Sequence, residues 1–253
     1  MDLGLKGLKA VLAGASKGIG RATAEVLVAE GCDVAICARD KAGVEKTVAA
    51  LAGKGGKAIG ESVSVGDREA YAGWIRRAAE QLGGCDIFVS FVTGSGGPAN
   101  EDTWKATFEL DVLGTWRGIQ AALPFLEQSK AGSIVAISTT AALEDFAGPQ
   151  AYNAMKAAVI AHAAAMSQAL APKGIRVNTV SPGPIYIEGG AWNWVKDNMA
   201  PFYEATVKGI PMGRMGSADE VARTIAFVAS PACRFMTGTN IVVDGGFTKR
   251  IQY

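Results

Sequence analysis

Short runs of apolar residues alternate with longer stretches of helical character along almost the whole chain. The apolar runs predict strands at 9–13, 33–37, 57–61, 86–90, 132–138, 175–181 and 240–243. The stretches between them predict helices at 18–30, 41–53, 67–82, 101–128, 150–172, 190–207 and 217–229. Most of the strands are nearly continuous in apolar residues, as in Ile87-Phe88-Val89. Strands of this kind are covered on both faces, which is typical of parallel sheets with helices on each side.

This alternation predicts an α/β fold, doubly wound and Rossmann-type, with a mostly seven-stranded parallel sheet. No linker, repeat or low-complexity tract interrupts the alternation, so residues 1–253 are expected to form a single domain. In such folds ligands bind beyond the carboxyl ends of the strands. Candidate functional residues are therefore expected at that edge of the sheet.

A glycine-rich turn follows the first expected strand and leads directly into the first expected helix. Glycines let the backbone approach a diphosphate closely, and the helix N-terminus directs free N–H groups toward it. The turn therefore predicts a dinucleotide site, although a strand-to-helix turn without a ligand would have the same local sequence. Its candidate cofactor-binding residues are Gly14, Ser16, Lys17, Gly18, Ile19 and Gly20.

The residues after the second expected strand bear on which dinucleotide is bound. An acidic side chain at this place would hold the ribose 2′-hydroxyl of NAD, whereas a basic one favours the 2′-phosphate of NADP. Here Ala38 is followed by Arg39, and Lys17 can reach the same place from the glycine turn. Two cations favour NADP(H) over NAD(H). Asp40 would oppose this preference if its side chain turned inward.

A second group of residues suggests acid–base chemistry. Tyr152 and Lys156 are spaced to lie on one face of the expected helix at 150–172. A tyrosine hydroxyl ordinarily ionises only near pH 10, as a rough value, and a neighbouring ammonium group stabilises the phenolate. Tyr152 could then exchange a proton with a carbonyl or alcohol oxygen. Ser138 and Thr139, at the end of the strand at 132–138, could polarise that oxygen, although hydroxyl residues also cap strand ends.

Composition excludes several classes of function. The chain of 253 residues has 25 basic and 24 acidic side chains, so no attraction to nucleic acid or to an anionic membrane is expected. Neither a signal peptide nor an 18-residue apolar span is recognised, and no membrane partner is expected. Four cysteines without metal-type spacing predict core residues in a protein of the reducing cytoplasm. His162 is the only histidine, so no metal site is expected, and its Ala-rich surroundings predict a packing role.

These motifs, taken in order, resemble the short-chain dehydrogenase/reductase family over essentially the whole chain, and especially its 3-oxoacyl-ACP-reductase-like members. The family's T-G-x3-G-x-G motif corresponds to 13–20, with alanine in place of threonine, and its Y-x3-K motif to Tyr152 and Lys156. The P-G pair after the sixth strand is matched by Pro182 and Gly183. Similar agreement extends through 213–222, 237–238 and 244–246. The resemblance implies NAD(P)(H)-linked alcohol oxidation or carbonyl reduction, commonly in a homotetramer, with Lys156 also binding the nicotinamide ribose.

The chain departs from the family pattern at several candidate positions. The usual catalytic serine corresponds by register to Thr139, with Ser138 as the alternate. The asparagine of the proton relay is replaced by Asp111, whose main-chain carbonyl would keep that role while its carboxylate adds a charge near Lys156. The threonine that bonds the nicotinamide carboxamide is replaced by Ile187. The remaining contacts that the resemblance assigns to the cofactor fall on Ser64, Val65, Phe91, Val92, Pro182, Gly183 and Ile185.

The segment near 186–212 is expected to cover the substrate as a lid, with Gly189 and Gly190 as hinge residues. It carries several aromatic side chains, which either pack in the core or line an apolar pocket. The sequence predicts hydride transfer between NADP(H) and a carbonyl or secondary alcohol, with an apolar or aromatic ketone as the substrate. The alternatives are an NAD(H)-dependent alcohol dehydrogenase of the same family, and a dinucleotide-binding sensor or scaffold with little turnover.

Overall fold

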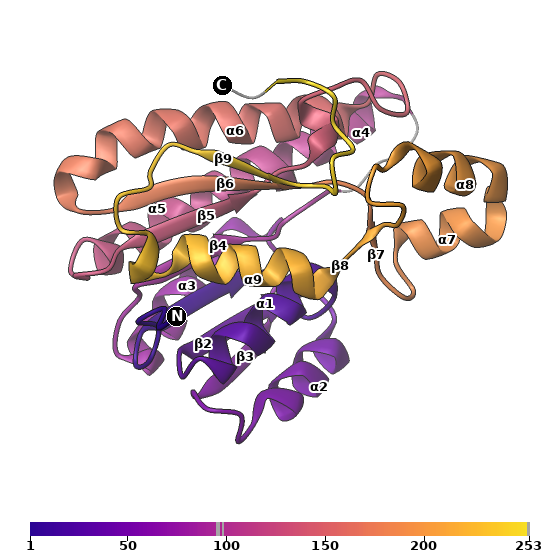
Figure 1. Cartoon of the computed structure of the whole chain (residues 1–253). Helices are drawn as coiled ribbons and strands as arrows, with labels where there is room; N and C mark the ends of the chain where they lie inside the picture. Colours follow the sequence, from indigo (N-terminus) through magenta and orange to yellow (C-terminus); the bar gives the residue numbers. More distant parts are fainter. Residues whose placement is uncertain (95–96, 98, 252–253) are drawn as a thin grey trace.

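The computed structural model describes residues 1–94, 97 and 99–251, and it is built around a parallel sheet of seven strands within this part of the chain (Figure 1). The strand order is β3-β2-β1-β4-β5-β6-β9, and every pair of neighbours runs parallel. The strands are β1 (Lys9–Ala13), β2 (Asp33–Ala38), β3 (Ala58–Ser62), β4 (Ile87–Ser90), β5 (Ser133–Ile137), β6 (Arg176–Pro182) and β9 (Asn240–Val243). The predicted fold class is confirmed, and each predicted strand begins within one residue of its observed start.

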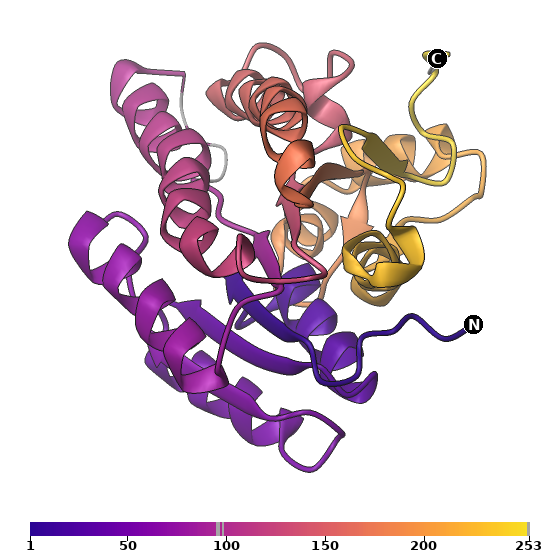
Figure 2. The same cartoon turned by 90° about the vertical axis from the view of Figure 1, so that its left-hand side faces the viewer.

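Helices cover both faces of this sheet (Figure 2). One buried cluster joins the sheet to the helices α3, α5 and α6, and a second joins its other face to α1, α2 and α9. The helices of the first layer are α3 (Arg68–Leu82), α4 (Glu101–Thr107), α5 (Thr115–Leu126) and α6 (Ala151–Leu170). Those of the second are α1 (Gly18–Ala29), α2 (Lys41–Leu51) and α9 (Ala218–Ala229). Both faces of the central strands are therefore buried, as their continuous apolar sequences predict.

The segment predicted as one helix at 101–128 consists of three parts. Between α4 and α5 lies η1 (Phe108–Gly114), a π-helical segment that contains Asp111. A π-helix is rare, and inside a longer helix it often marks a functional site. Its i→i+5 bonding has no signature in the pattern of apolar residues, so the sequence predicted an uninterrupted helix.

The prediction of one continuous helix at 190–207 is wrong. The structure has α7 (Ala191–Asn198) and α8 (Ala200–Gly209), separated by Met199. Pro201 lies in the first turn of α8, where its missing N–H costs nothing, whereas in a continuous helix it would remove an internal hydrogen bond. The sequence reading also missed a two-stranded sheet formed by β7 (Ile185–Tyr186) and β8 (Gly216–Ser217) at the two ends of this segment.

Short 3-10 turns complete the described structure: η2 (Thr140–Ala142), η3 (Ala171–Lys173) and η4 (Pro231–Cys233). The chain builds β1, β2 and β3 outward on one side, then crosses back to place β4 on the other side of β1. This reversal creates a crevice at the carboxyl ends of β1 and β4, the usual ligand position in such sheets. The α7–α8 pair projects beyond the same end of the sheet (Figure 1).

Candidate active site

The glycine turn lies at the crevice between β1 and β4. Gly14 has φ +81°, and a Cβ on it would lie 3.3 Å from the main chain of Phe91, which follows β4. Gly20 leaves no room for a side chain, because a Cβ there would lie 2.8 Å from the Cα of Ala15. Gly14 therefore supplies the backbone conformation of the turn, and Gly20 the close approach of α1 to the strand.

The N-terminus of α1 provides the features that a diphosphate requires. Lys17 is the N-cap residue, and its side chain makes no capping hydrogen bond to the first turn. Gly18 follows with φ +56° and no Cβ to narrow the space in front of the turn. The N–H groups of this turn therefore lack a side-chain cap, and they suit an anion at the positive end of the helix dipole. Ser16 and Ile19 belong to the same turn and are half-buried.

The position of a 2′-phosphate would lie near the carboxyl end of β2. Lys17 and Arg39 are both exposed, and neither forms an ion pair with another described residue. Asp40 is the N-cap residue of α2, and its Oδ2 lies beside Gly43 in the first turn of that helix. The carboxylate therefore sits against α2. Ser64, which is exposed, and Val65, which is buried, follow β3 at the same edge of the sheet.

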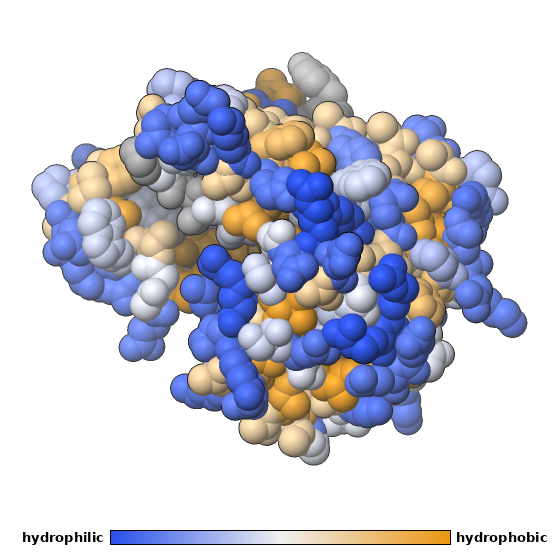
Figure 3. All heavy atoms as spheres, turned by 180° about the vertical axis from the view of Figure 1, so that it is seen from behind, coloured by the Kyte–Doolittle hydropathy of each residue, from blue (hydrophilic) through white to orange (hydrophobic). Residues whose placement is uncertain are grey.

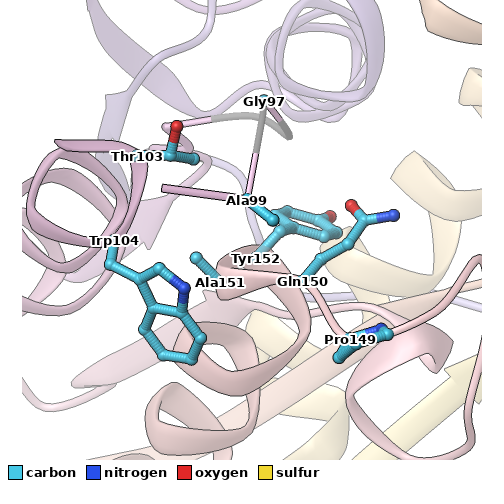
Figure 4. Close-up of a pocket in the computed structure, with 8 residues that line it drawn as sticks. All are labelled: Gly97, Ala99, Thr103, Trp104, Pro149, Gln150, Ala151 and Tyr152. Carbon is cyan, nitrogen blue, oxygen red and sulfur yellow. The ribbon is translucent and has the colours of Figure 1, made fainter. Parts of the chain in front are cut away.

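Tyr152 and Lys156 lie on one face of α6, with Lys156 Nζ 6.0 Å from the centre of the Tyr152 ring. Tyr152 is half-buried and lines a cavity of about 20 Å³ with Ala99, Thr103 and Gln150 (Figure 4). Lys156 is only 3% exposed. Tyr152 therefore lines a small cavity, whereas the Lys156 ammonium group is enclosed.

The Lys156 ammonium group is surrounded by three oxygen atoms. Its Nζ donates 3.0 Å hydrogen bonds to the main-chain oxygens of Val92 and Ile137, and it lies 2.8 Å from Asp111 Oδ1. The other carboxylate oxygen, Oδ2, accepts a 2.6 Å hydrogen bond from the N–H of Gly94. The side chain of Asp111 thus contacts the lysine directly and also fixes the chain that follows β4.

Ser138 and Thr139 differ in how much of their hydrogen-bonding capacity is used. Ser138 is buried, and its Oγ donates a 2.9 Å hydrogen bond to the main-chain oxygen of Lys156. Thr139 is half-buried, and its Oγ1 only accepts a 3.3 Å hydrogen bond from the N–H of Ala141. The Thr139 hydroxyl keeps its proton available for another acceptor. This geometry favours Thr139 over Ser138 as the group that would polarise a substrate oxygen.

Pro182 and Gly183 lie at the carboxyl end of β6, where the chain packs against the residue that follows β9. A Cβ on Gly183 would lie 2.5 Å from the Cβ of Asp244, so only glycine allows this contact. Ile185 begins β7 and is buried, and Ile187 extends its Cδ1 to 3.1 Å from the position of a Cβ on Gly18. An apolar side chain thus reaches the glycine turn where the family has threonine.

An aromatic cluster joins the segment 186–212 to two other parts of the chain, and the sequence analysis located it only in part. Phe146, in the loop between Thr139 and Tyr152, has its ring centre 6.1 Å from that of Trp192, 5.9 Å from that of Phe202 and 5.6 Å from that of Phe247. Trp192 stacks on Phe202 at 6.0 Å. The surface is hollowed between the α7–α8 pair, on the left of Figure 3, and the rest of the molecule.

The sequence analysis missed Phe146, although an aromatic residue between the two candidate catalytic segments was a usable signal. It also missed Asn153, whose Nδ2 donates 3.3 Å hydrogen bonds to the main-chain oxygens of Phe146 and Gly148. These bonds tie the Phe146 loop to the residue after Tyr152. Cys32, Cys37, Cys85 and Cys233 are all buried and unpaired, as predicted. Within the described ranges, no group of three possible metal ligands is present, and no helix is long and apolar enough to cross a membrane.

The fold and this site define a dinucleotide-binding oxidoreductase. A family model described as enoyl-(acyl carrier protein) reductase matches residues 14–248. The chain is 35% identical to isoepoxydon dehydrogenase patN of Aspergillus clavatus, over 98% of each chain. It is 33% identical to trans-4-hydroxycyclohexanecarboxylate dehydrogenase of Sinomonas cyclohexanicum, covering 94% of this chain and 92% of that protein. It is 30% identical to 3-oxoacyl-[acyl-carrier-protein] reductase FabG of Vibrio harveyi, covering 96% and 98%.

Among solved structures, the chain resembles L-sorbose reductase from Gluconobacter frateurii, which was determined with NADPH and L-sorbose. The TM-score is 0.91 at 27% sequence identity, over 99% of this chain and all of that one (100%). The chain belongs to the short-chain dehydrogenase/reductase family, as its motifs predicted. It is an oxidoreductase that acts with a nicotinamide dinucleotide on a small-molecule substrate.

Proposed function

We propose that the protein transfers a hydride between NADP(H) and a carbonyl or secondary alcohol, with Tyr152 as the acid and base. The observation that carries this proposal is the placement of Tyr152 and Lys156 on one face of α6, with Lys156 Nζ 6.0 Å from the centre of the Tyr152 ring. The phenol borders a cavity and is supported by an enclosed cation. Such an arrangement suits proton transfer at an oxygen atom.

The nicotinamide ring supplies or accepts the hydride when the cofactor is bound. In the direction of reduction, the Thr139 hydroxyl donates a hydrogen bond to the substrate oxygen and withdraws charge from the carbonyl carbon. Tyr152 then gives its proton to the oxygen as negative charge develops there. In the direction of oxidation, Tyr152 removes that proton from the alcohol. Ser138 holds α6 against the end of β5 and takes no part in these steps.

Replacing Tyr152 with phenylalanine tests the assignment. Tyr152→Phe is expected to lower kcat by at least about 10²-fold, because the proton donor is lost. The Kd for NADPH, followed by quenching of tryptophan fluorescence, should stay close to that of the wild type, since the ring is kept. Turnover near the wild-type rate would exclude Tyr152 as the acid and base.

We also propose that the enzyme prefers NADP(H) to NAD(H). Lys17 and Arg39 are exposed and unpaired with described residues, and the Asp40 carboxylate lies against α2, which leaves two cations for a 2′-phosphate. The solved relative with NADPH bound is consistent with this preference. Arg39→Asp should raise the Kd for NADPH. The preference for NADPH over NADH, measured as the ratio of their affinities, should fall by roughly tenfold or more. An unchanged ratio would exclude Arg39 as the determinant.

The substrate that we propose is an apolar or aromatic ketone, or the corresponding secondary alcohol, with a ring of moderate size. Support comes from the aromatic cluster around Phe146 and Trp192, and from the relative named for a hydroxylated cyclohexane carboxylate. A panel of cyclic, aromatic and acyclic ketones, monitored through the near-ultraviolet absorbance of NADPH, tests this class. A marked preference for acyclic polar ketones would contradict it.

We further propose a homotetramer of single-domain chains in the cytoplasm, each with a lid at about 186–212. The exposed Trp104, Phe108 and Trp116 on the α4–η1–α5 helix offer an apolar surface that a second copy would cover. The buried, unpaired cysteines suit a reducing compartment. Analytical ultracentrifugation of the wild type and of Trp116→Arg tests the assembly. A monomeric wild type would contradict it.

A further inference from the structure

Asp111 and Lys156 form an ion pair that is almost fully removed from solvent. The Asp111 side chain is 0% exposed and that of Lys156 is 3% exposed, with 2.8 Å between Oδ1 and Nζ. Water screens such a pair poorly, so removing either charge leaves the other uncompensated. The π-helical turn of η1 brings the carboxylate to the lysine.

The contact between the two side chains depends mainly on charge. Asp111 Oδ2 is hydrogen-bonded to the N–H of Gly94, and Oδ1 faces the Lys156 ammonium group at 2.8 Å with no further donor among the described residues. Lys156 directs its hydrogen bonds to the main-chain oxygens of Val92 and Ile137. The lysine would therefore keep its position through those two carbonyl groups if the carboxylate lost its charge.

Few other titratable groups lie on the elements around this pair. On the same helix as Lys156 are Tyr152 and His162, and η1 also carries Glu109, which pairs with Arg68 of α3 and Arg117 of α5 near the surface. The titratable and charged residues of α4 are the exposed Glu101, Asp102 and Lys105. Strands β4 and β5 contribute none, and β6 contributes the buried Arg176 at its first residue, where it is bonded to the main-chain oxygens of Val228 and Ala229. Asp111 is therefore the buried carboxylate that balances Lys156.

We propose that Asp111 is a positioning residue that weakens the positive field of Lys156 beside Tyr152 and the nicotinamide position. This proposal rests on the proposed role of Tyr152. In the wild type the carboxylate offsets part of the positive field that the ammonium group presents to Tyr152. Phenolate formation at Tyr152 then receives less support than a lone ammonium would give, and a positively charged nicotinamide ring meets less repulsion.

The first test is the pH profile of alcohol oxidation, which requires Tyr152 without its proton. Asp111→Asn keeps the shape of the side chain and removes its charge, which leaves Lys156 uncompensated. Because an uncompensated cation favours the phenolate, the rising limb of kcat/KM should move to lower pH by about one unit. A limb that stays in place or moves to higher pH would overturn the proposal.

The second test measures binding and does not depend on turnover. In the Tyr152→Phe background, Kd values for NADP⁺ and NADPH are measured by tryptophan fluorescence with and without Asp111→Asn. The added positive charge should raise the Kd for NADP⁺ relative to the Kd for NADPH by roughly three- to tenfold. An unchanged ratio would overturn the proposal. Retained turnover of Tyr152→Phe alone would instead overturn the proposed function, so the two failures are distinguishable.

Glu109→Gln provides the matched control. It removes one negative charge from the same π-helical segment, at a side chain that is 31% exposed. Its pH profile and affinity ratio should equal those of the wild type. If Asp111→Asn does not fold, as judged by circular dichroism, the binding ratio is measured on Asp111→Ser, which leaves space for water. If neither Asp111→Asn nor Asp111→Ser folds while Glu109→Gln does, Asp111 is required for folding, and the proposal is overturned.

Discussion

The Oγ of Ser138 donates a 2.9 Å hydrogen bond to the main-chain oxygen of Lys156, a residue 18 positions away in the sequence. This bond joins the end of β5 to the helix that carries both Tyr152 and Lys156. The neighbouring Thr139 hydroxyl accepts a hydrogen bond from the N–H of Ala141 but donates none to a described residue. The two adjacent hydroxyl groups thus have different tasks in the proposed mechanism, one structural and one chemical.

Substitutions at these two residues should separate the tasks. Thr139→Val keeps the shape but removes the donor, and it should lower kcat by roughly 10²-fold, as loss of a hydrogen bond to a developing oxyanion does. Thr139→Ser keeps the hydroxyl and should retain most activity. Ser138→Ala should lower the free energy of unfolding by about 1 kcal/mol with a smaller effect on kcat. Steady-state kinetics and urea unfolding give both quantities, and a reversed pattern would make Ser138 the polarising group.

The sheet was predictable because each parallel strand is buried on both faces, so its sequence is a run of consecutive apolar residues. Val89, for example, pairs with Leu12 on one side and Val135 on the other. The glycine turn was predictable for a similar reason, since Gly14 and Gly20 are required by local backbone conformation and close packing. Both features leave a signature in a short stretch of sequence, the apolar run of one strand or the glycines of one turn, although the partners that they contact are distant.

The contacts around Lys156 were predictable only in outline. A carboxylate near the lysine follows from the resemblance at Asp111, but the direct 2.8 Å contact depends on the π-helical turn of η1, which no residue pattern specifies. Phe146 illustrates the same limit, because its partners Trp192, Phe202 and Phe247 come from two distant segments. The break at Met199, by contrast, had a local signal in Pro201 that the apolar periodicity obscured.

Phe146 should influence substrate affinity through its contacts with the α7–α8 pair. Its ring contacts Trp192 and Phe202, so Phe146→Ala removes the packing between the loop before Tyr152 and the α7–α8 pair. KM for an aromatic ketone should rise about tenfold, equivalent to about 1.4 kcal/mol, which is the upper range for an aromatic contact. Trp194→Ala, on the same helix as Trp192 but 59% exposed, is the control and should leave KM unchanged. Equal effects of the two variants would show that the cluster does not shape the site.

Glu220 should make stability depend on acid pH. Hydrogen bonds from Arg214 and from the N–H of Ser217 lower its pKa from the ordinary 4.5 to about 2. A carboxyl group with a lowered pKa stabilises the folded state fully above about pH 4.5, and this contribution is lost as the pH falls toward 2. The Tm of Glu220→Gln should therefore fall less than that of the wild type between these pH values. Glu204→Gln is the control, since Glu204 is exposed, and equal slopes for all three proteins would contradict the prediction.

The four cysteine thiols should be inert in the native protein. Burial raises the pKa of Cys32 and of Cys37 to about 12, and it raises the pKa of Cys85 and Cys233 above the ordinary value as well. Because the thiolate is the reactive form, a disulfide reagent at about pH 8 should find almost no reactive thiol in the folded protein. Denaturation should release all four. Phe235→Cys, at a fully exposed position, should add one fast-reacting thiol. Rapid reaction of a native thiol without this substitution would show that one of the four lies in a segment that opens to solvent.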